Sequence, residues 1–178
     1  CTPATLTAPI LLKWMLVWEH PVSHTLWLGK AVPRVWLSEG ETVSVQVIGC
    51  LVNKNQTGRV ELFLFSLLVL AQGAGTAYGK VSMALHSLIG SQNIIKANIT
   101  LDAPTACTST SYCGRALGAL TLRLRTPGKR SIAKVLVGGE HWPTFDNDAE
   151  SISFRSAALR HDGTTFNPKL QDIVVTYS

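Results

Sequence analysis

The stretch "LTLRLRTPGKRSIAKVLVGG" (residues 120–139) alternates leucine with arginine, turns at a Pro-Gly pair and resumes as an apolar run. Successive side chains of a β-strand point to opposite faces, so this alternation is typical of a strand with one buried face. Leu122 and Leu124 would then face a core. Arg123 and Arg125 would face away from it. Because a Pro-Gly pair between two such segments is a turn signal, we predict two strands joined as a hairpin.

The period of two recurs in the surrounding sequence. The segment "ETVSVQVIGCLV" (41–52) places valines on one face and Thr, Ser and Gln on the other. After the polar cluster "NKNQTG" (53–58), the β-prone run "RVELFLFSLLVL" (59–70) predicts the second strand of an antiparallel pair. The further candidate strands are residues 13–18, 24–29, 79–88, 93–101, 116–125, 131–138, 150–156 and 172–178.

Helical patterns are nearly missing. No window of eleven or more residues carries an apolar stripe at helical spacing with capping residues, although residues 82–91 could form one or two turns. About eight short strands at regular spacing indicate an all-β, antiparallel β-sandwich with little helix. We predict a single domain over residues 13–178. Residues 1–12 are predicted to form an extended arm, because Pro3 and Pro9 disfavour regular structure.

Composition favours a folded domain with an anionic partner. The chain has 178 residues, of which 46% are apolar, and this excludes general disorder. Its 16 basic and 11 acidic residues give a net charge of +5, which favours nucleic acid as a partner. The most apolar run, residues 60–71, is much shorter than the roughly 20 residues that a membrane-spanning helix requires. A membrane partner is therefore not predicted.

The opening stretch concentrates positive charge. Its five cations are Arg123, Arg125, Lys129, Arg130 and Lys134. They could form a solvated face that keeps a sheet edge soluble, or they could contact phosphates or an acidic neighbouring chain. No aromatic residue stands among them in the sequence, so base stacking is not predicted. Any contact with nucleic acid would be electrostatic and insensitive to base sequence. We take these five residues as candidates for contact with nucleic acid or with another subunit.

Carboxylates at alternate positions make Asp146, Asp148 and Glu150 candidates for calcium ligands. The glycine and the distant glutamate of an EF-hand loop are missing, so a solvated acidic loop is the preferred interpretation and no metal is predicted. His20 and His24 have an i, i+4 spacing, but the residues around them are strand-like and no HExxH pattern is present.

Enzyme signatures are also missing. The sequence has no GxSxG, Walker or GxGxxG motif, and its 11 acidic residues leave few paired carboxylates. We therefore predict neither catalysis nor a cofactor. Cys107 and Cys113 flank a loop rich in Ser and Thr and could form a disulfide, with free thiols as the alternative.

The sequence contains five tryptophans, namely Trp14, Trp18, Trp27, Trp36 and Trp142. Their role allows two interpretations. Buried, they would supply a core or an interface with other chains, and exposed, they could stack on sugars. We favour core and interface. The alternative function is a secreted carbohydrate-binding β-sandwich, which would use exposed tryptophans and carry glycans at the sequons of Asn55 and Asn98.

Three segments also carry a resemblance of pattern to a known family. The first, "ETVSVQVIGCLVNKNQTGRVELFLFSL" (41–67), is similar to a strand, polar loop and strand near the middle of the family's protein. The second, "GKVSMALHSLIGSQ" (79–92), resembles the strand and Gly/Ser-bearing turn that follow. The third, "LGALTLRLRTPGKRSIAKVLVGGEHWPTF" (117–145), resembles the penultimate strands and the Pro-bearing exit. The family is the small coat protein of the comovirus, fabavirus and nepovirus group of plant picorna-like viruses.

This resemblance implies a viral jelly roll, which is a β-sandwich built from two Greek keys. It implies that the chain, which starts at Cys1 without an initiator Met, is released from a polyprotein. It further implies a structural capsid subunit that assembles with copies of itself and with a larger coat protein into an icosahedral shell around single-stranded RNA. The protein would be found in the virion, and in the host cell cytoplasm before assembly.

Overall fold

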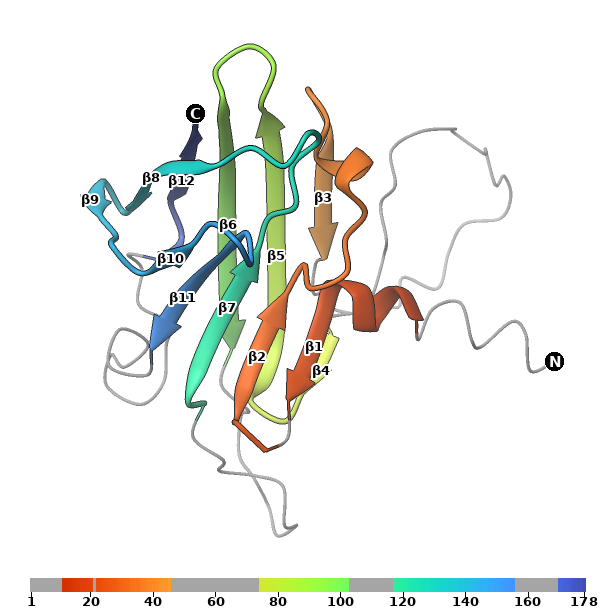
Figure 1. The fold of residues 1–178 in the computed structure, drawn as a ribbon. Coiled ribbons are helices and arrows are strands. Elements are labelled where there is room, and N and C mark those ends of the chain that lie inside the picture. Colours follow the sequence, from red (N-terminus) through yellow and green to blue (C-terminus); the bar gives the residue numbers. More distant parts are fainter. Residues whose placement is uncertain (1–10, 21, 46–73, 103–116, 156–169) are drawn as a thin grey trace, which may run out of the picture.

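The computed structural model describes residues 11–20, 22–45, 74–102, 117–155 and 170–178 (Figure 1). A helical segment over residues 11–16 opens this part of the chain. The strands are β1 (Val17–His20), β2 (Thr25–Leu28), β3 (Thr42–Val45), β4 (Ala74–Thr76), β5 (Gly79–Leu88), β6 (Ile94–Asp102), β7 (Ala119–Arg123), β8 (Ile132–Val137), β9 (Glu140–His141), β10 (Phe145–Asp146), β11 (Ser151–Arg155) and β12 (Ile173–Tyr177). A short 3-10 helix, η1 (Arg34–Leu37), lies between β2 and β3. Within these ranges, no helix has the length and apolar character needed to cross a membrane.

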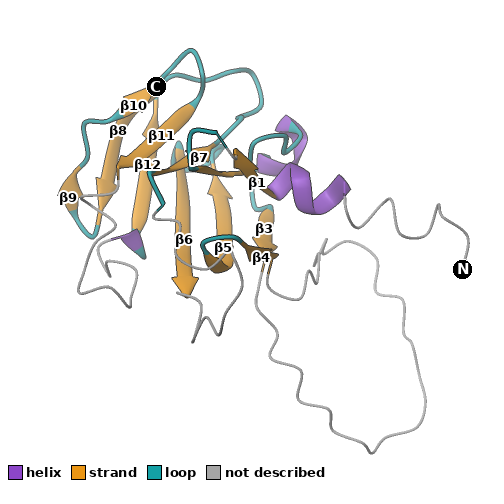
Figure 2. Ribbon diagram, turned by 90° about the horizontal axis from the view of Figure 1, so that it is seen from below, coloured by secondary structure: helices purple, strands orange, loops and turns teal. Residues whose placement is uncertain are grey.

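The strands form two sheets that face one another (Figures 1 and 2). One sheet has the order β1-β2-β7-β11-β10, and the other has the order β3-β5-β6-β12-β8-β9 with β4 paired to β5. The described pairs are antiparallel except for β2 with β7, which run parallel. The predicted all-β sandwich with little helix is thereby confirmed. The jelly-roll topology stays a prediction, and the parallel pair departs from the antiparallel strands of that architecture.

The core lies between the two sheets and follows from the period of two. In β5, Val81, Met83 and Leu85 are buried, whereas Ala84 is half-buried and His86 is exposed. Apolar side chains from the five-stranded sheet pack into the same core, namely Leu26, Leu28, Leu120, Leu122, Ile152 and Phe154. Each sheet therefore has one face toward the core and an outer face that is available for other contacts.

The stretch 120–139 does not form the predicted hairpin. β7 pairs with β2 and β11 in one sheet, whereas β8 pairs with β12 and β9 in the other. The Pro-Gly pair does form a turn, but tertiary contacts hold the residues before and after it. The buried Leu124 donates its N–H to the carbonyl of Glu150, and the hydroxyl of Thr126 accepts the N–H of Arg130. The segment between β7 and β8 is therefore a crossover, which leads the chain from one sheet to the other. Turn chemistry alone does not decide which strands pair.

Most of the other predicted strands in the described ranges are present. Residues 79–88 coincide with β5, and the candidates at 24–29, 93–101, 116–125, 131–138, 150–156 and 172–178 match β2, β6, β7, β8, β11 and β12 with small shifts at their ends. Of the segment 41–52, residues 42–45 form β3, which pairs with β5. The rest of that segment and its predicted partner at 59–70 lie outside the described residues.

The predicted strand at 13–18 is mostly helical. The helical segment covers residues 11–16, and β1 begins only at Val17. A strand would place Trp14 and Leu16 on the same face, but Trp14 is 49% exposed while Leu16 is 1% exposed. Because the helix separates these two side chains, Leu16 enters the core and Trp14 stays at the surface. Of the predicted arm, residues 1–10 lie outside the described ranges.

Candidate functional site

The outer face of the five-stranded sheet carries a pair of tryptophans. The register between β1 and β2 places Trp18 opposite Trp27, and the parallel register between β2 and β7 places Trp27 beside Thr121. Because Leu26 and Leu28 on either side of Trp27 are buried in the core, the indole of Trp27 faces away from it. Trp18 and Trp27 are both half-buried, so part of each ring is available on this face.

Gly29, directly after β2, allows the chain to pass close to β7. Its φ of +67° lies in the left-handed region that favours glycine, and a Cβ here would lie 2.6 Å from the carbonyl oxygen of Arg123. Its N–H donates to the carbonyl of Leu16 at 2.7 Å. Arg123 donates from Nη1 to the carbonyl oxygen of Lys30 at 3.3 Å and from Nε to that of Ala149 at 3.1 Å. These backbone contacts fix the guanidinium of Arg123 beside Lys30.

The ammonium group of Lys30 lies over both indole rings. Its Nζ is 4.7 Å from the ring centroid of Trp18 and 5.7 Å from that of Trp27. Cation–π attraction holds an ammonium group in this position. Trp14, from the helical segment, meets Trp18 edge to face with ring centroids 5.9 Å apart and an interplanar angle of 82°. Three aromatic side chains and one cation thus form a single cluster.

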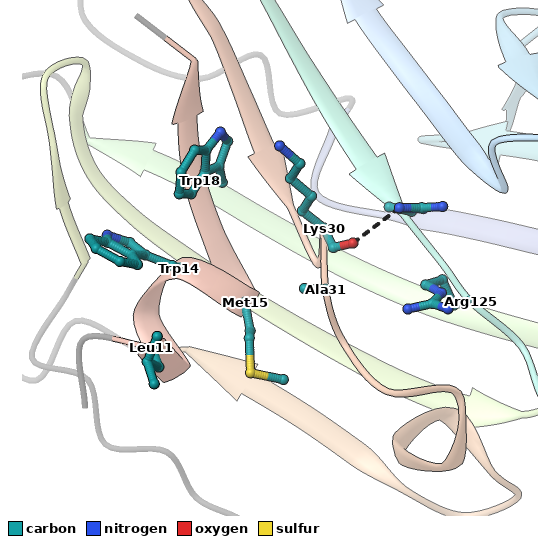
Figure 3. Close-up of a pocket in the computed structure, with 8 residues that line it drawn as sticks. Leu11, Trp14, Met15, Trp18, Lys30, Ala31 and Arg125 are labelled. Carbon is teal, nitrogen blue, oxygen red and sulfur yellow. Dashed lines mark hydrogen bonds between the residues drawn. The ribbon is translucent and has the colours of Figure 1, made fainter. Parts of the chain in front are cut away.

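This cluster forms part of an open groove of about 560 Å³. We call it the Trp/Arg groove; it is lined by Leu11, Trp14, Met15, Trp18, Lys30, Ala31, Arg123 and Arg125 (Figure 3). Figure 3 shows Trp14 and Trp18 on one side, Arg125 on the other and Lys30 between them. The lining residues include three cations and no carboxylate. A groove of this composition attracts anions.

Two lining residues carry a buried donor without a hydrogen-bond partner in the described part of the chain, namely Nε1 of Trp18 and Nε of Arg125. Leaving such a donor unpaired costs about 1–3 kcal/mol, and the large majority of buried polar groups in native proteins are paired. Neither nitrogen is open to solvent, so a ligand in the groove would reach them only if the side chains around them moved. The groove therefore has the charge, but not the accessible unpaired donors, expected of an anion-binding surface.

The five predicted cations do not form one surface. Arg123 and Arg125 line the Trp/Arg groove. Lys129 and Arg130 lie in the crossover, where Nη1 of Arg130 donates to Oδ1 of Asn93. Lys134 is exposed on β8, which belongs to the other sheet. The charge cluster seen in the sequence is thus divided between the two sheets, because the predicted hairpin is a crossover.

Lys30 and the aromatic residues of the groove were missed as partners of these cations. No aromatic residue stands among the cations in the sequence, but the fold brings Trp14, Trp18 and Trp27 to the same side as Arg123. One signal was present in the sequence. The candidate strands at 13–18 and 24–29 flank a short loop, and pairing them as a hairpin places Trp18 opposite Trp27. Nothing local in the sequence indicates that β7 lies beside β2.

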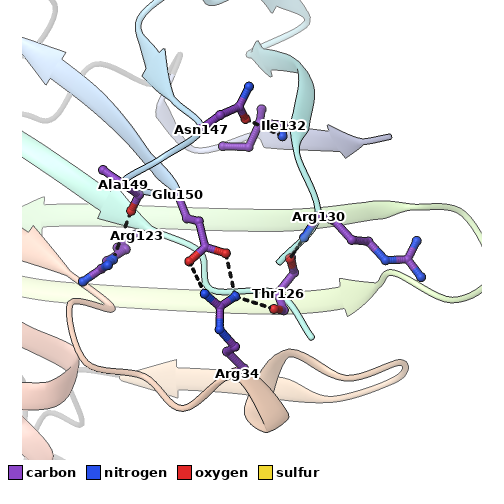
Figure 4. Close-up of polar contacts among 8 residues, drawn as sticks. All are labelled: Arg34, Arg123, Thr126, Arg130, Ile132, Asn147, Ala149 and Glu150. Atoms are coloured by element: carbon purple, nitrogen blue, oxygen red, sulfur yellow. Dashed lines mark hydrogen bonds and ion pairs between the residues drawn. The ribbon is translucent and has the colours of Figure 1, made fainter. Parts of the chain in front are cut away.

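The acidic loop has structural roles. Oδ1 of Asp146 accepts the backbone N–H of Asp148 at 2.8 Å and that of Ala149 at 3.0 Å. The side chain of Glu150 is 4% exposed and forms two hydrogen bonds of 2.6 Å with Arg34 (Figure 4). Hydrogen bonding to Glu150 raises the pKa of the Arg34 guanidinium. In the described ranges no three potential ligands gather around a metal position, so these three carboxylates do not form the calcium site considered above.

The remaining candidate residues have local roles or fall outside the described ranges. Trp36 and Trp142 pack against the core, as predicted, and Nε1 of Trp142 donates to the carbonyl of Ser153 at 3.1 Å. Nδ1 of His20 accepts the N–H of Ser23 in the β1–β2 turn. Asn98 is exposed on β6. Cys107, Cys113 and the sequon at Asn55 lie outside the described residues.

Searches against protein-family models, curated proteins and solved structures each found no match to this chain. The resemblance to the small coat proteins stays a prediction. A functional proposal for this protein therefore rests on its fold, its charge and the geometry of the Trp/Arg groove.

Proposed function

We propose that this chain is a structural subunit of an icosahedral viral shell that encloses single-stranded RNA. The subunit would assemble with copies of itself and with a larger coat protein, and it would have no catalytic role. It would reside in the virion and, before assembly, in the host cell cytoplasm. The two-sheet, all-β architecture supports this proposal, because viral shells are commonly built from β-sandwiches of the jelly-roll type. The jelly-roll topology is part of the proposal.

The Trp/Arg groove is the observation that carries this proposal. It places Lys30, Arg123 and Arg125 beside two tryptophans, and no carboxylate lines it. Such a surface favours a polyanion that also offers flat groups for stacking, and single-stranded RNA has both properties. The net charge of +5 acts in the same direction at longer range.

Exposed apolar side chains support assembly into a larger particle. Val22 is 83% exposed, Val35 is 66% exposed and Leu11 is 49% exposed. Isolated apolar residues are common on protein surfaces, so none of these is decisive by itself. Subunits of a closed shell nevertheless need apolar contact surfaces on several sides, and residues of this kind are buried at such interfaces.

Sedimentation of the native protein tests the proposal. The protein would be isolated from its source without denaturant, sedimented through a sucrose gradient and viewed by electron microscopy. We expect fast-sedimenting isometric particles that contain this chain, a larger coat protein and RNA that a single-strand-specific ribonuclease degrades after the particles are opened. A slowly sedimenting monomer without RNA would contradict the proposal.

A carbohydrate-binding module is the second candidate function, and the exposure of Trp14 favours it. A ring that is 49% exposed could stack on a sugar. Against this function, the ammonium of Lys30 already occupies positions over the rings of Trp18 and Trp27. Calorimetric titration with neutral oligosaccharides distinguishes the two functions, because only a lectin would bind them and lose that binding on Trp14→Ala.

A further inference from the structure

We propose that the Trp/Arg groove is a nucleotide-sized site for single-stranded RNA, in which a base stacks on Trp14 and flanking phosphates contact Lys30 and Arg125. The choice of RNA as the polyanion rests on the proposed function, whereas the geometry of the groove defines the site itself.

The charge of the groove selects an anion. Its three cations, Lys30, Arg123 and Arg125, come from two separate parts of the chain, and its lining contains no carboxylate that could neutralise them. Arg123 is already fixed by two backbone carbonyls, so Lys30 and Arg125 are the cations with donors to offer. The volume of about 560 Å³ is within the range of roughly 300–1,000 Å³ that is typical of small-ligand sites.

The aromatic side of the groove selects a flat group. Trp14 is 49% exposed. It meets Trp18 edge to face, so the two rings are not stacked and at least one ring face is not covered by the other ring. A base that stacks there would lie in the same groove as the ammonium of Lys30, which is held over Trp18 at 4.7 Å. A stacking ring and a fixed cation in one groove match the alternation of base and phosphate along a nucleic-acid strand.

The stacking surface on Trp14 also decides which form of nucleic acid fits. A single strand is required, because the faces of bases in a duplex are covered by their neighbours. Since every base has a flat face, the site would accept any base, which agrees with sequence-insensitive packaging.

Fluorescence anisotropy with a labelled uridine decamer tests this site on the purified full-length chain. We expect Trp14→Ala to weaken binding about 5- to 150-fold, the usual effect of losing one base stack. Trp14→Phe should retain most of the affinity, because a smaller ring still stacks. Arg125→Gln should weaken binding and lower the slope of log K against log salt by about 0.7, the change expected for one phosphate contact on a single strand.

Two exposed residues outside the groove provide matched controls. Lys134→Gln removes the same charge as Arg125→Gln but from the other sheet, and Val35→Ala removes an exposed apolar side chain away from the groove. Both variants should bind the decamer like wild type. Because Trp14 is at the surface, its variants should fold, and their far-UV circular dichroism should match that of wild type.

The outcomes separate this inference from the proposed function. If Lys134→Gln weakens binding as much as Arg125→Gln, or if Trp14→Ala has no effect, binding is diffuse attraction and the site is overturned. Tighter, Trp14-dependent binding of a glutamate decamer would also overturn it and would indicate an acidic protein segment as the occupant. If the chain binds no RNA while native particles contain RNA, the inference fails and the proposed function stands. If the chain binds RNA at this site but no particles are found, the inference stands and the proposed function as a shell subunit fails.

Discussion

At the scale of single residues, the ion pair between Arg34 and Glu150 connects three separate parts of the chain. Arg34 is in η1, and Glu150 precedes β11. Nη1 of Arg34 also donates to the carbonyl of Thr126 in the crossover at 2.7 Å. The side chain of Glu150 is almost completely buried, whereas that of Arg34 is 32% exposed. A buried carboxylate depends on its partner, because its charge has lost most of its hydration.

We expect Arg34→Met to lower the free energy of unfolding by about 3 kcal/mol, the low end of the effect of breaking a buried ion pair, since Arg34 is partly reached by water. The loss arises because the charge of Glu150 stays buried without a partner. Urea denaturation followed by circular dichroism measures it. The double variant Arg34→Met with Glu150→Leu should recover most of the stability. Equal losses in the single and double variants would show that the buried charge is not the cause.

Glu39 provides a second prediction, which concerns pH. Hydrogen bonds from the hydroxyl of Ser91 and the backbone N–H of Gly90 lower the pKa of the Glu39 carboxyl. Because the folded pKa lies below the unfolded one, the stabilisation is present above the unfolded pKa of about 4.3 and is lost as the pH falls through the folded value. Glu39→Gln should therefore lose less stability than wild type between neutral and acidic pH. An NMR titration of Glu39 with an ordinary glutamate pKa would refute this.

At the scale of elements, the end of β2 determines whether the groove can form. Gly29 passes so close to β7 that the carbonyl of Arg123 leaves no room for a Cβ, and the next residue is Lys30. Gly29, a residue without a side chain, therefore permits two features of the site. These are the pairing of β2 with β7 and the position of Lys30 over the tryptophans. Gly128, in the crossover, also has a positive φ of +74°, but no atom lies within 4 Å of a Cβ there.

Comparison of these two glycines gives a third prediction. Gly128→Ala should cost about 1–2 kcal/mol of stability, the conformational penalty of the left-handed region. Gly29→Ala should cost clearly more, because it adds a clash with backbone that cannot be relieved by a side-chain rotation. Thermal or urea unfolding of both variants measures the difference. If the two variants are equally stable, the close approach of β2 to β7 is not required.

At the scale of the whole molecule, the two sheets use only their inner faces for the core. Their outer faces and the connecting loops carry the tryptophan pair, the groove and the exposed Val22 and Val35. The free energy of folding therefore depends little on these surface residues, whereas association depends on them. Substitutions at these surface residues can therefore change assembly without changing the fold.

A fourth prediction follows for self-association. The double variant Val22→Ser with Val35→Ser should unfold within about 0.5 kcal/mol of wild type, because both side chains are exposed in the single chain. It should nevertheless remain monomeric at concentrations where wild type associates. Sedimentation velocity over a range of concentrations measures this. A wild-type chain that stays monomeric at high concentration would argue against these residues as interface contacts.

The amino-acid sequence predicts the class of fold, because the period of two in segments such as β5 and β7 places alternate side chains on opposite faces, one of them toward a core. It also located most strands of the described ranges within a few residues. It did not determine the helical segment at 11–16, since an apolar stretch with Trp14 and Leu16 fits either period. Short apolar runs are compatible with both helix and strand until packing selects one.

The place where the functional groups meet depends on the packing of the two sheets. Strand pairing is a long-range choice that depends on burial of whole faces, so the Pro-Gly turn of residues 120–139 could not reveal that β7 and β8 belong to different sheets. That choice separated Lys134 from Arg123 and placed Arg123 beside Lys30 and Trp18 instead. The sequence supplied the cations and the tryptophans, and the fold alone brought them to one groove, because side chains that are distant in sequence become neighbours only through the packing of the sheets.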